Sequence, residues 1–302
     1  MHFLSSLIYS SSATQTLKHL GYPRNTKLLI VHADDMGLSH STNLACMKAM
    51  DEGLVNSGSI MMPCPFAEEM ISFSKLNPTK DIGIHITLTS EWRGHQWKPI
   101  LGMQVSSLVN SEGFFFESGG ELLEKAILSE VEKEMCAQIE FALSCGMQPT
   151  HLDSHMFSGI SNPEFLKIYI RVGRKYSLPV LLNREKIKKW FRYNLDPYLS
   201  DQEIPVSQLF IATPRQVRKG FPWFYRNVLQ SIKPGLNCLL VHPAFDDDEM
   251  KILTHGYTDY NSSWRQADFD FFTSNECGQI IQERNIQLIT WREIMEISKS
   301  KT

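Results

Sequence analysis

Two adjacent carboxylates, Asp34 and Asp35, follow an apolar stretch near the start of the chain. Residues 27–33 have the composition of a buried strand, and Gly37 breaks the pattern just after the two acids. Burying a charge is costly unless the charge is paired or bound to a metal. We therefore expect the two acids to hold a metal, to activate a water, or to divide these two tasks.

Three further segments carry groups that bind metals or move protons. His85 lies inside an apolar stretch, His151, Asp153 and His155 stand at alternate positions, and His242 ends another apolar stretch. Alternate side chains of an extended segment face one side, and an aspartate can orient a ligating imidazole. Any one of these could be a buried core histidine or a polar strand end. Together with the two acids they favour a divalent ion held by two imidazoles and one carboxylate, with the second carboxylate as general base and a further histidine as acid.

The segments around these residues alternate between strand and helix. Strands are expected at 27–33, 55–62, 82–88, 149–155, 178–182, 236–241 and 286–290. Helices are expected at 13–21, 42–52, 66–76, 121–145, 163–176, 221–231 and 266–284, and from residue 291 onward. A long irregular stretch covers 90–120, and the pattern over 183–215 is mixed. About seven such units predict parallel βαβ connections and a closed or nearly closed (β/α) barrel, which brings the polar strand ends to one face.

Composition narrows the function further. The chain has 302 residues, a net charge of -3 and no basic stripe, so we expect no nucleic-acid partner. Its six cysteines include no Cys-x-x-Cys pair, which favours a reducing compartment. No apolar run approaches the roughly 20 residues that span a bilayer, and the first ten residues lack the basic start of a signal peptide. We expect a cytoplasmic protein without a membrane partner.

Four blocks of sequence and a weaker fifth stand in order along nearly the whole chain, at 29–39 (Leu-Ile-Val-His-Ala-Asp-Asp-Met-Gly-Leu-Ser), 83–89 (Gly-Ile-His-Ile-Thr-Leu-Thr), 149–155 (Pro-Thr-His-Leu-Asp-Ser-His), 242–245 (His-Pro-Ala-Phe) and 265–274. In these blocks the chain resembles the YdjC-like carbohydrate deacetylases, a family that includes chitooligosaccharide deacetylases. The resemblance implies a single-domain α/β fold, a distorted TIM-like (β/α) barrel at 26–298, after an N-terminal extension at 1–25 with a short helix.

The resemblance also implies roles for individual residues. The metal ligands would be Asp35, His85 and His155, binding one divalent ion, Mg²⁺ or Zn²⁺. Asp34 would be the catalytic base, although adjacency leaves the roles of the two acids exchangeable. The remaining roles go to His242, as the acid or the group that orients the acetyl oxygen, and to His151 and Asp153, as support for the ligands.

The expected reaction is hydrolysis of the N-acetyl group of a sugar or oligosaccharide such as a chitooligosaccharide. Substrate contacts are assigned to Trp92, Trp97, Arg265 and Asp270, because sugar rings stack on aromatic side chains and the last two follow the family pattern. Two alternatives are hydrolysis of another amide or ester, such as a lipid-linked amino sugar, and a non-catalytic sugar-binding barrel. A homodimer is compatible with the sequence.

The chain departs from the family pattern at two places. Typical members carry further histidines after the residue matched by His155, where this chain has Met156 and Phe157. His32 stands where asparagine is common, and we interpret it as a packing residue or a support for the ligands. A substrate different from chitobiose is compatible with the first departure and with the long aromatic loop after residue 89.

Overall fold

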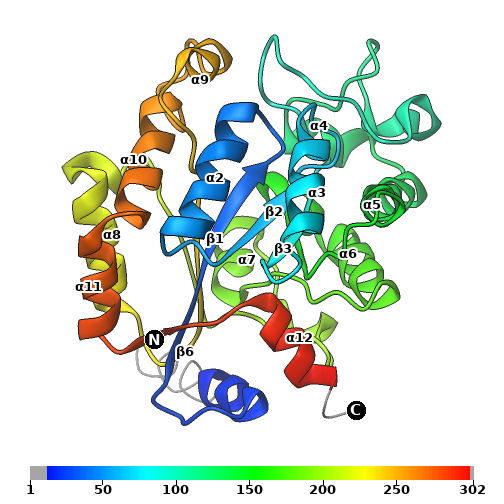
Figure 1. The fold of residues 1–302 in the computed structure, drawn as a ribbon. Helices are drawn as coiled ribbons and strands as arrows, with labels where there is room; N and C mark the ends of the chain where they lie inside the picture. The colour runs from blue at the N-terminus through cyan, green and yellow to red at the C-terminus, as the bar shows by residue number, and fades with distance from the viewer. Residues whose placement is uncertain (1–11, 300–302) are drawn as a thin grey trace.

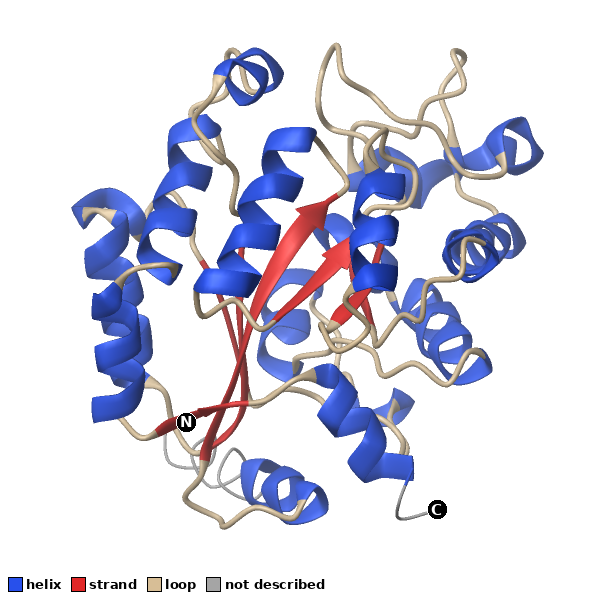
Figure 2. Cartoon of the chain, in the orientation of Figure 1, coloured by secondary structure: helices blue, strands red, loops and turns tan. Residues whose placement is uncertain are grey.

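The computed structural model describes residues 12–299, which form one parallel sheet surrounded by helices (Figures 1 and 2). The strands are β1 (Lys27–Met36), β2 (Ser57–Ile60), β3 (Ile82–Ile86), β4 (Leu152–Ser154), β5 (Gln208–Ile211), β6 (Gly235–Val241) and β7 (Ile286–Leu288). Their order in the sheet is β4-β3-β2-β1-β6-β5, and β7 also pairs with β1. All of these pairings are parallel.

The helices cover the outside of the sheet. They are α2 (His40–Glu52), α3 (Ala67–Leu76), α4 (Gly119–Lys125), α5 (Leu128–Ser144), α6 (Pro163–Lys175), α7 (Arg184–Phe191), α8 (Phe221–Ser231), α9 (Asp248–Leu253), α10 (Ser262–Phe272), α11 (Asn275–Glu283) and α12 (Trp291–Lys299). Short 3-10 helices lie at η1 (Gly102–Leu108), η2 (His155–Ile160), η3 (Asp196–Tyr198) and η4 (Val217–Lys219), and a further helix spans 12–20. In Figure 1, α8, α10 and α11 lie to one side of β1, and α5 and α6 lie to the other.

β1 is the centre of the sheet. β6 pairs with it over residues 27–33, while β7 and β2 share its other edge, β7 along the first half and β2 along the second. At the far edges the sheet curls toward closure: the amide of Leu181 donates to the carbonyl of Leu152 in β4, and the amide of Val206 donates to the carbonyl of Leu182. The fold is therefore the predicted single-domain α/β structure, a distorted and incompletely paired (β/α) barrel.

Both faces of β1 are buried, which explains its uninterrupted apolar sequence. Leu29 and Val31 pack with the helices in the larger core cluster. Leu28 and Ile30 point the other way, into a smaller cluster inside the barrel that Leu17 of the N-terminal helix also joins. This helix overlaps the predicted N-terminal extension, of which residues 1–11 lie outside the described part of the chain. The division of the chain at residue 25 stays a prediction.

Several predicted elements were wrong in detail. The helix expected at 121–145 is two helices, because residues 126 and 127 are extended and the hydroxyl of Ser107 accepts the amide hydrogen of Ile127. The helix expected at 266–284 is also two, and Ser274 caps the second by accepting from the amide of Cys277. Residues 178–182 form an isolated bridge at Val180 rather than a strand. The unassigned stretch 183–215 contains α7 and β5.

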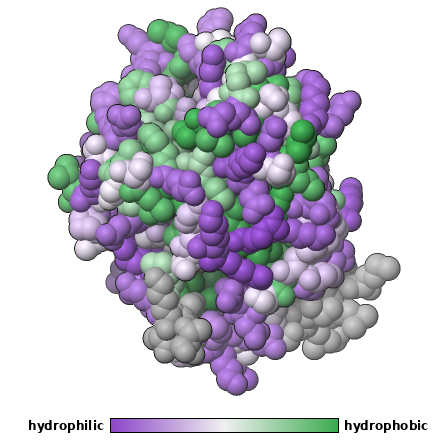
Figure 3. Space-filling model, turned by 90° about the vertical axis from the view of Figure 1, so that its right-hand side faces the viewer, coloured by the Kyte–Doolittle hydropathy of each residue, from purple (hydrophilic) through white to green (hydrophobic). Residues whose placement is uncertain are grey.

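The surface in Figure 3 is mainly hydrophilic, with smaller apolar areas between the polar side chains. Over residues 12–299, none of the helices has the length and apolar character required to cross a bilayer.

Candidate active site and metal centre

The two adjacent acids lie at the carboxyl end of β1, where a β-bulge changes the register. Residues 33–36 of β1 pair against residues 58–60 of β2, so β1 carries one extra residue over this step. Asp35 has a φ of 64°, in the left-handed region that non-glycine residues seldom adopt. Neighbouring side chains of a regular strand point to opposite faces, but the bulge lets Asp34 and Asp35 line the same cavity.

Three side chains from separate segments converge beside this bulge. Oδ1 of Asp35 lies 3.5 Å from Nε2 of His85 on β3 and 3.3 Å from Nδ1 of His155, the first residue after β4. One potential ligand atom from each residue lies within 4.8 Å of the other two. All three side chains are buried. Two imidazoles and a carboxylate, all nearly excluded from water, fit a divalent ion that keeps open positions.

A second pair of carboxylates orients the two imidazoles. Nδ1 of His85 donates to Oδ2 of Asp153 at 2.6 Å, and Nε2 of His155 lies 3.0 Å from both oxygens of Glu91. The other nitrogen of each ring is therefore the one that faces Asp35. Metal-binding histidines commonly donate their far N–H to a carboxylate in this way, which fixes the tautomer and raises the basicity of the ligand.

These carboxylates also control protonation of the imidazoles. Burial lowers the pKa of His85, but Asp153 outweighs this and raises the pKa well above its ordinary value. Burial likewise lowers the pKa of His155, but Glu91 and then Asp35 raise it to about 9. Without a cation, each imidazole ring is protonated on both nitrogens, and so positively charged, at neutral pH. A metal ion must therefore displace protons when it binds.

The two acids of the bulge differ sharply in their electrostatics. Burial raises the pKa of Asp35, but Nη2 of Arg265, 2.8 Å from Oδ2, and the two imidazoles hold it well below its ordinary value. Burial raises the pKa of Asp34 to about 7. Among the described residues, Oδ1 of Asp34 has no hydrogen-bond partner, and its nearest basic group is Nε2 of His32 at 3.3 Å.

His242 lies beside Asp34, on the loop after β6. Its Nε2 is 3.7 Å from Oδ2 of Asp34, and its ring meets that of Tyr260 edge-on at 5.2 Å. The backbone amide of His242 donates to Oδ2 of Asp268 at 2.8 Å, which ties the end of β6 to α10. Burial lowers the pKa of His242 to about 3, so its ring is neutral at pH 7.

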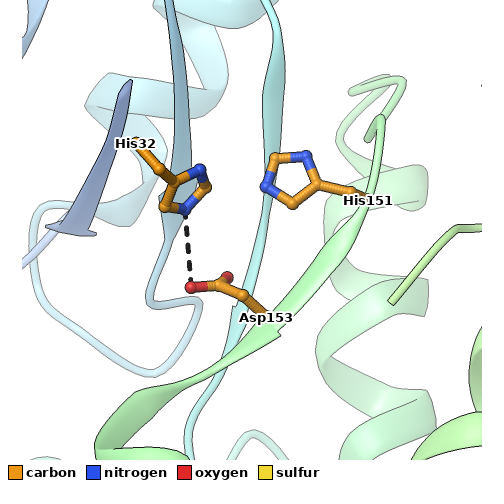
Figure 4. Close-up of side chains that lie close together, drawn as sticks. All are labelled: His32, His151 and Asp153. Carbon is orange, nitrogen blue, oxygen red and sulfur yellow. Dashed lines mark ion pairs between the residues drawn. The ribbon is translucent and has the colours of Figure 1, made fainter. Parts of the chain in front are cut away.

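Three further polar side chains, His32, His151 and Asp153, form a cluster next to the candidate ligand His85 (Figure 4). Nε2 of His32 is 3.4 Å from Oδ2 of Asp153, the same oxygen that accepts from His85. His151 meets His32 edge-on at 4.9 Å and stacks on Trp291. Asp153 thus hydrogen-bonds to the predicted ligand His85, whereas His151 packs against His32 on the side of Trp291. The side chains of His32, His151 and Asp153 lie close enough together that they could also hold a cation.

The residues predicted to contact substrate separate into two groups. Trp92 and Arg265 line the cavity, but they also contact each other: the guanidinium lies 5.2 Å from the centre of the indole, and Tyr257 stacks on that indole. Trp97 is buried and meets His155 edge-on at 5.9 Å. Its indole therefore packs behind a predicted ligand, outside the cavity lining.

Asp270 is not brought to the cavity. It is exposed on α10 and accepts from Nε2 of Gln266 at 2.8 Å. The buried acid of this helix is Asp268, which the sequence did not single out. Arg265 and Asp268 are three residues apart and share the inner face of the helix, whereas Asp270, two residues later, points outward.

Glu91 is the other residue that sequence reasoning missed. It lies two residues after the block that ends at Thr89, in a long loop with no periodic pattern. Its contact with His155 spans 64 residues of sequence. The available signal was its position a few residues after β3, which ends at Ile86 and carries the candidate ligand His85.

The fold and the site together define a (β/α) barrel with a candidate metal centre at the carboxyl ends of its strands. The sequence of the chain also matches the model of a known protein family. Residues 28–283 match the family model of the YdjC-like proteins, and the chain belongs to this family.

Curated relatives of the chain are deacetylases. A carbohydrate deacetylase of Thermus thermophilus is 30% identical over 276 residues, covering 89% of this chain and 94% of the relative. A chitooligosaccharide deacetylase of Yersinia enterocolitica is 32% identical over 281 residues, covering 87% and 97%. A crystal structure from Enterococcus faecalis, of a protein to which cellobiose-phosphate cleavage has been attributed, superimposes with a TM-score of 0.75 at 27% identity, covering 89% and 99%. The predicted family is thus confirmed.

Proposed function

We propose that this protein is a metal-dependent carbohydrate deacetylase that hydrolyses the N-acetyl group of an amino sugar or oligosaccharide. The observation that carries the proposal is the pairing of two differently poised acids at one bulge. Asp35 faces two carboxylate-oriented imidazoles, while Asp34, its neighbour, faces the same cavity with a raised pKa. The deacetylase relatives supply the substrate class.

In this proposal the ligands are Asp35, His85 and His155. A divalent cation held there would polarise the acetyl carbonyl and lower the pKa of a water molecule. Two imidazoles suit Zn²⁺ better than Mg²⁺, which prefers oxygen ligands. Arg265 keeps Asp35 ionised, and Asp153 and Glu91 keep the near nitrogens of the two rings turned toward it.

Asp34 is the proton carrier. With a pKa of about 7 it is partly ionised at neutral pH, so it can take a proton from the attacking water and later return it. The water oxygen bonds to the acetyl carbon, the carbon–nitrogen bond breaks, and the returned proton goes to the amine of the sugar. Acetate and the free amino sugar are the products.

His242 orients the acetyl group. A ring with a pKa of about 3 does not hold the extra proton that a general acid must give at pH 7. A neutral imidazole still carries one N–H, which can donate to the acetyl oxygen. Of the two roles implied for His242 by the family resemblance, the electrostatics favour orientation.

The test is acetate release from N-acetylglucosamine oligomers by protein stripped of metal with a chelator and then reloaded with Zn²⁺ or Mg²⁺. We expect activity to return with one of these ions and to be absent from the Asp34→Asn variant. Release of a different acid from other amides or esters, with no acetate released, would favour the alternative hydrolase. Failure to bind either ion would favour a non-catalytic sugar-binding barrel.

A further inference from the structure

The cavity that holds the candidate site has two chemically different halves. Its volume is about 530 Å³. One half carries the acids and histidines described above, with Tyr257 and Asp259 at its edge. The other half is lined mainly by apolar side chains from η2, α7, β5 and β6, among them Phe157, Trp190 and Leu240. Three polar side chains, Asn183, Lys186 and Thr213, also belong to the lining.

The apolar half is part of the barrel interior. Leu181, Leu209 and Leu240 belong to the cluster inside the sheet and are at most 6% exposed. The rings of Phe157 and Trp190 pack 4.7 Å apart. Protein interiors rarely leave voids much larger than a water molecule. A cavity with largely apolar walls on one side, continuous with the candidate site, therefore has room for part of a ligand.

The walls of this half favour an apolar occupant. A sugar ring could stack on the aromatic side chains, but its hydroxyl groups would find few partners, because Asn183 and Thr213 already hydrogen-bond within the protein. An acetyl group has a single methyl and would contact only a small part of these walls. A longer aliphatic chain matches the walls, because apolar cavities exclude water and bind apolar groups.

The position of the apolar half favours a chain on the acyl side of the amide. Phe157 comes two residues after the candidate ligand His155, and Leu240 two residues before His242. In the pose that we infer, a chain attached to the scissile carbonyl would extend toward these side chains, and the sugar would extend toward Tyr257 and Asp259, which also line the cavity.

We propose that the preferred substrate is an amino sugar with an N-acyl chain longer than acetyl, whose aliphatic tail occupies the apolar half of the cavity. This inference rests on the proposed hydrolysis of an amide at the same site, and it narrows the substrate class. The same chemistry could enter as an alkyl group on the sugar's anomeric oxygen, and the experiment separates these two sources.

The experiment measures release of glucosamine from its N-acetyl, N-butanoyl, N-hexanoyl and N-octanoyl derivatives, which give the same amine product. Each methylene buried should raise kcat/KM roughly fourfold, so hexanoyl should exceed acetyl about 200-fold. A kcat/KM that falls with chain length overturns the inference but leaves deacetylation standing. Hydrolysis of the longer chains without hydrolysis of the acetyl derivative supports the inference and overturns deacetylation as the function.

Two further measurements test the inference if none of the derivatives is hydrolysed, or if the preference for longer chains has a cause other than the apolar half of the cavity. Calorimetric binding to Asp34→Asn should favour N-octanoylglucosamine over N-acetylglucosamine at least tenfold, and equal binding overturns the inference. Octyl N-acetylglucosaminide is the second comparison. If an alkyl chain raises kcat/KM only when it is attached to the anomeric oxygen, the placement of the chain on the acyl side of the amide is wrong.

A cavity-filling variant tests the location. Ile211→Trp places a large ring in the apolar half, and the ratio of kcat/KM for octanoyl over acetyl should fall toward one. Ile252→Trp is the matched control, because Ile252 lies on α9, is 65% exposed and is outside the cavity lining. It should keep the ratio of the unmodified protein. An unchanged ratio in folded Ile211→Trp overturns the placement.

Discussion

Replacing Glu91 by glutamine should change metal affinity in a way that depends on pH. Glu91 touches the far nitrogen of His155 with both oxygens, so it makes the near nitrogen a stronger ligand. Loss of such an outer carboxylate typically costs ten- to a hundredfold in metal affinity. The same carboxylate also raises the pKa of His155, which makes protons stronger competitors for the ring.

The size of this competition follows from the pKa of about 9 for His155. At pH 7 only about 1% of the rings lack the proton, which lowers metal affinity about a hundredfold, or ~2.7 kcal/mol. The Glu91→Gln change lowers the pKa of His155, so protons compete less with the metal at pH 7, but it also makes His155 a weaker ligand. At pH 7 these two effects on metal affinity largely cancel. At pH 9 about half of the rings are already deprotonated. There the full ten- to hundredfold loss of affinity should appear.

The assay is competition for Zn²⁺ against a chelator of known affinity at pH 7 and pH 9. Glu117→Gln is the control, because Glu117 lies in the same loop, is exposed and pairs with Arg93. It should behave as the unmodified protein at both pH values. An affinity loss for Glu91→Gln that is equal at the two pH values, or larger at pH 7, would refute the role given to Glu91.

Four other predictions follow from the same site. Asp34→Asn should lower kcat by a factor of about 10² to 10⁴ with unchanged metal content by elemental analysis; activity close to normal would remove Asp34 as the base. His85→Ala and His155→Ala should each lower the metal bound per chain, and full stoichiometry would exclude that residue as a ligand. The profile of kcat/KM should fall on the acid side with a midpoint no higher than about 7, because the base must be ionised and a bound cation lowers the pKa of Asp34 further; a midpoint near pH 8 would contradict this. Asp270→Ala should leave kcat/KM within about twofold, since its side chain is exposed.

Much of the fold followed from the sequence because both faces of its strands are buried. Continuous apolar runs such as that at 27–33 mark such strands, and their alternation with helices defines a parallel sheet. Helix breaks were harder to predict. The break before α5 depends on Ser107, some 20 residues away, whose hydroxyl accepts from the amide of Ile127. A tertiary contact of this kind leaves no local periodic signal.

The candidate site was predictable where its residues lie on strands or directly after them. Asp35, His85 and His155 meet because parallel strands bring their carboxyl ends together. Glu91 was missed because it lies in an irregular loop, where sequence spacing says nothing about position. Asp270 was assigned a substrate contact from the family pattern, and Asp268 was not considered. The three-residue spacing of Arg265 and Asp268 on a helix would have indicated the correct face.

The sequence also could not show why two neighbouring acids behave differently. Asp34 and Asp35 are equally buried, at 5% and 4% exposure, so burial alone would treat them alike. The bulge separates their partners. Asp35 lies beside Arg265 and two imidazoles and stays ionised. Asp34 faces the cavity with a pKa of about 7, and its Oδ1, 3.3 Å from Nε2 of His32, accepts no hydrogen bond from the described residues.

In the proposed mechanism, this divergence favours Asp35 as the metal ligand and Asp34 as the base. A metal ligand must be deprotonated at working pH, and a base must be able to gain and lose a proton there. Two titratable groups whose surroundings push their pKa values apart can therefore divide the chemistry between them. An extra residue in β1 and a left-handed φ at Asp35 let adjacent positions meet these opposite demands within one cavity.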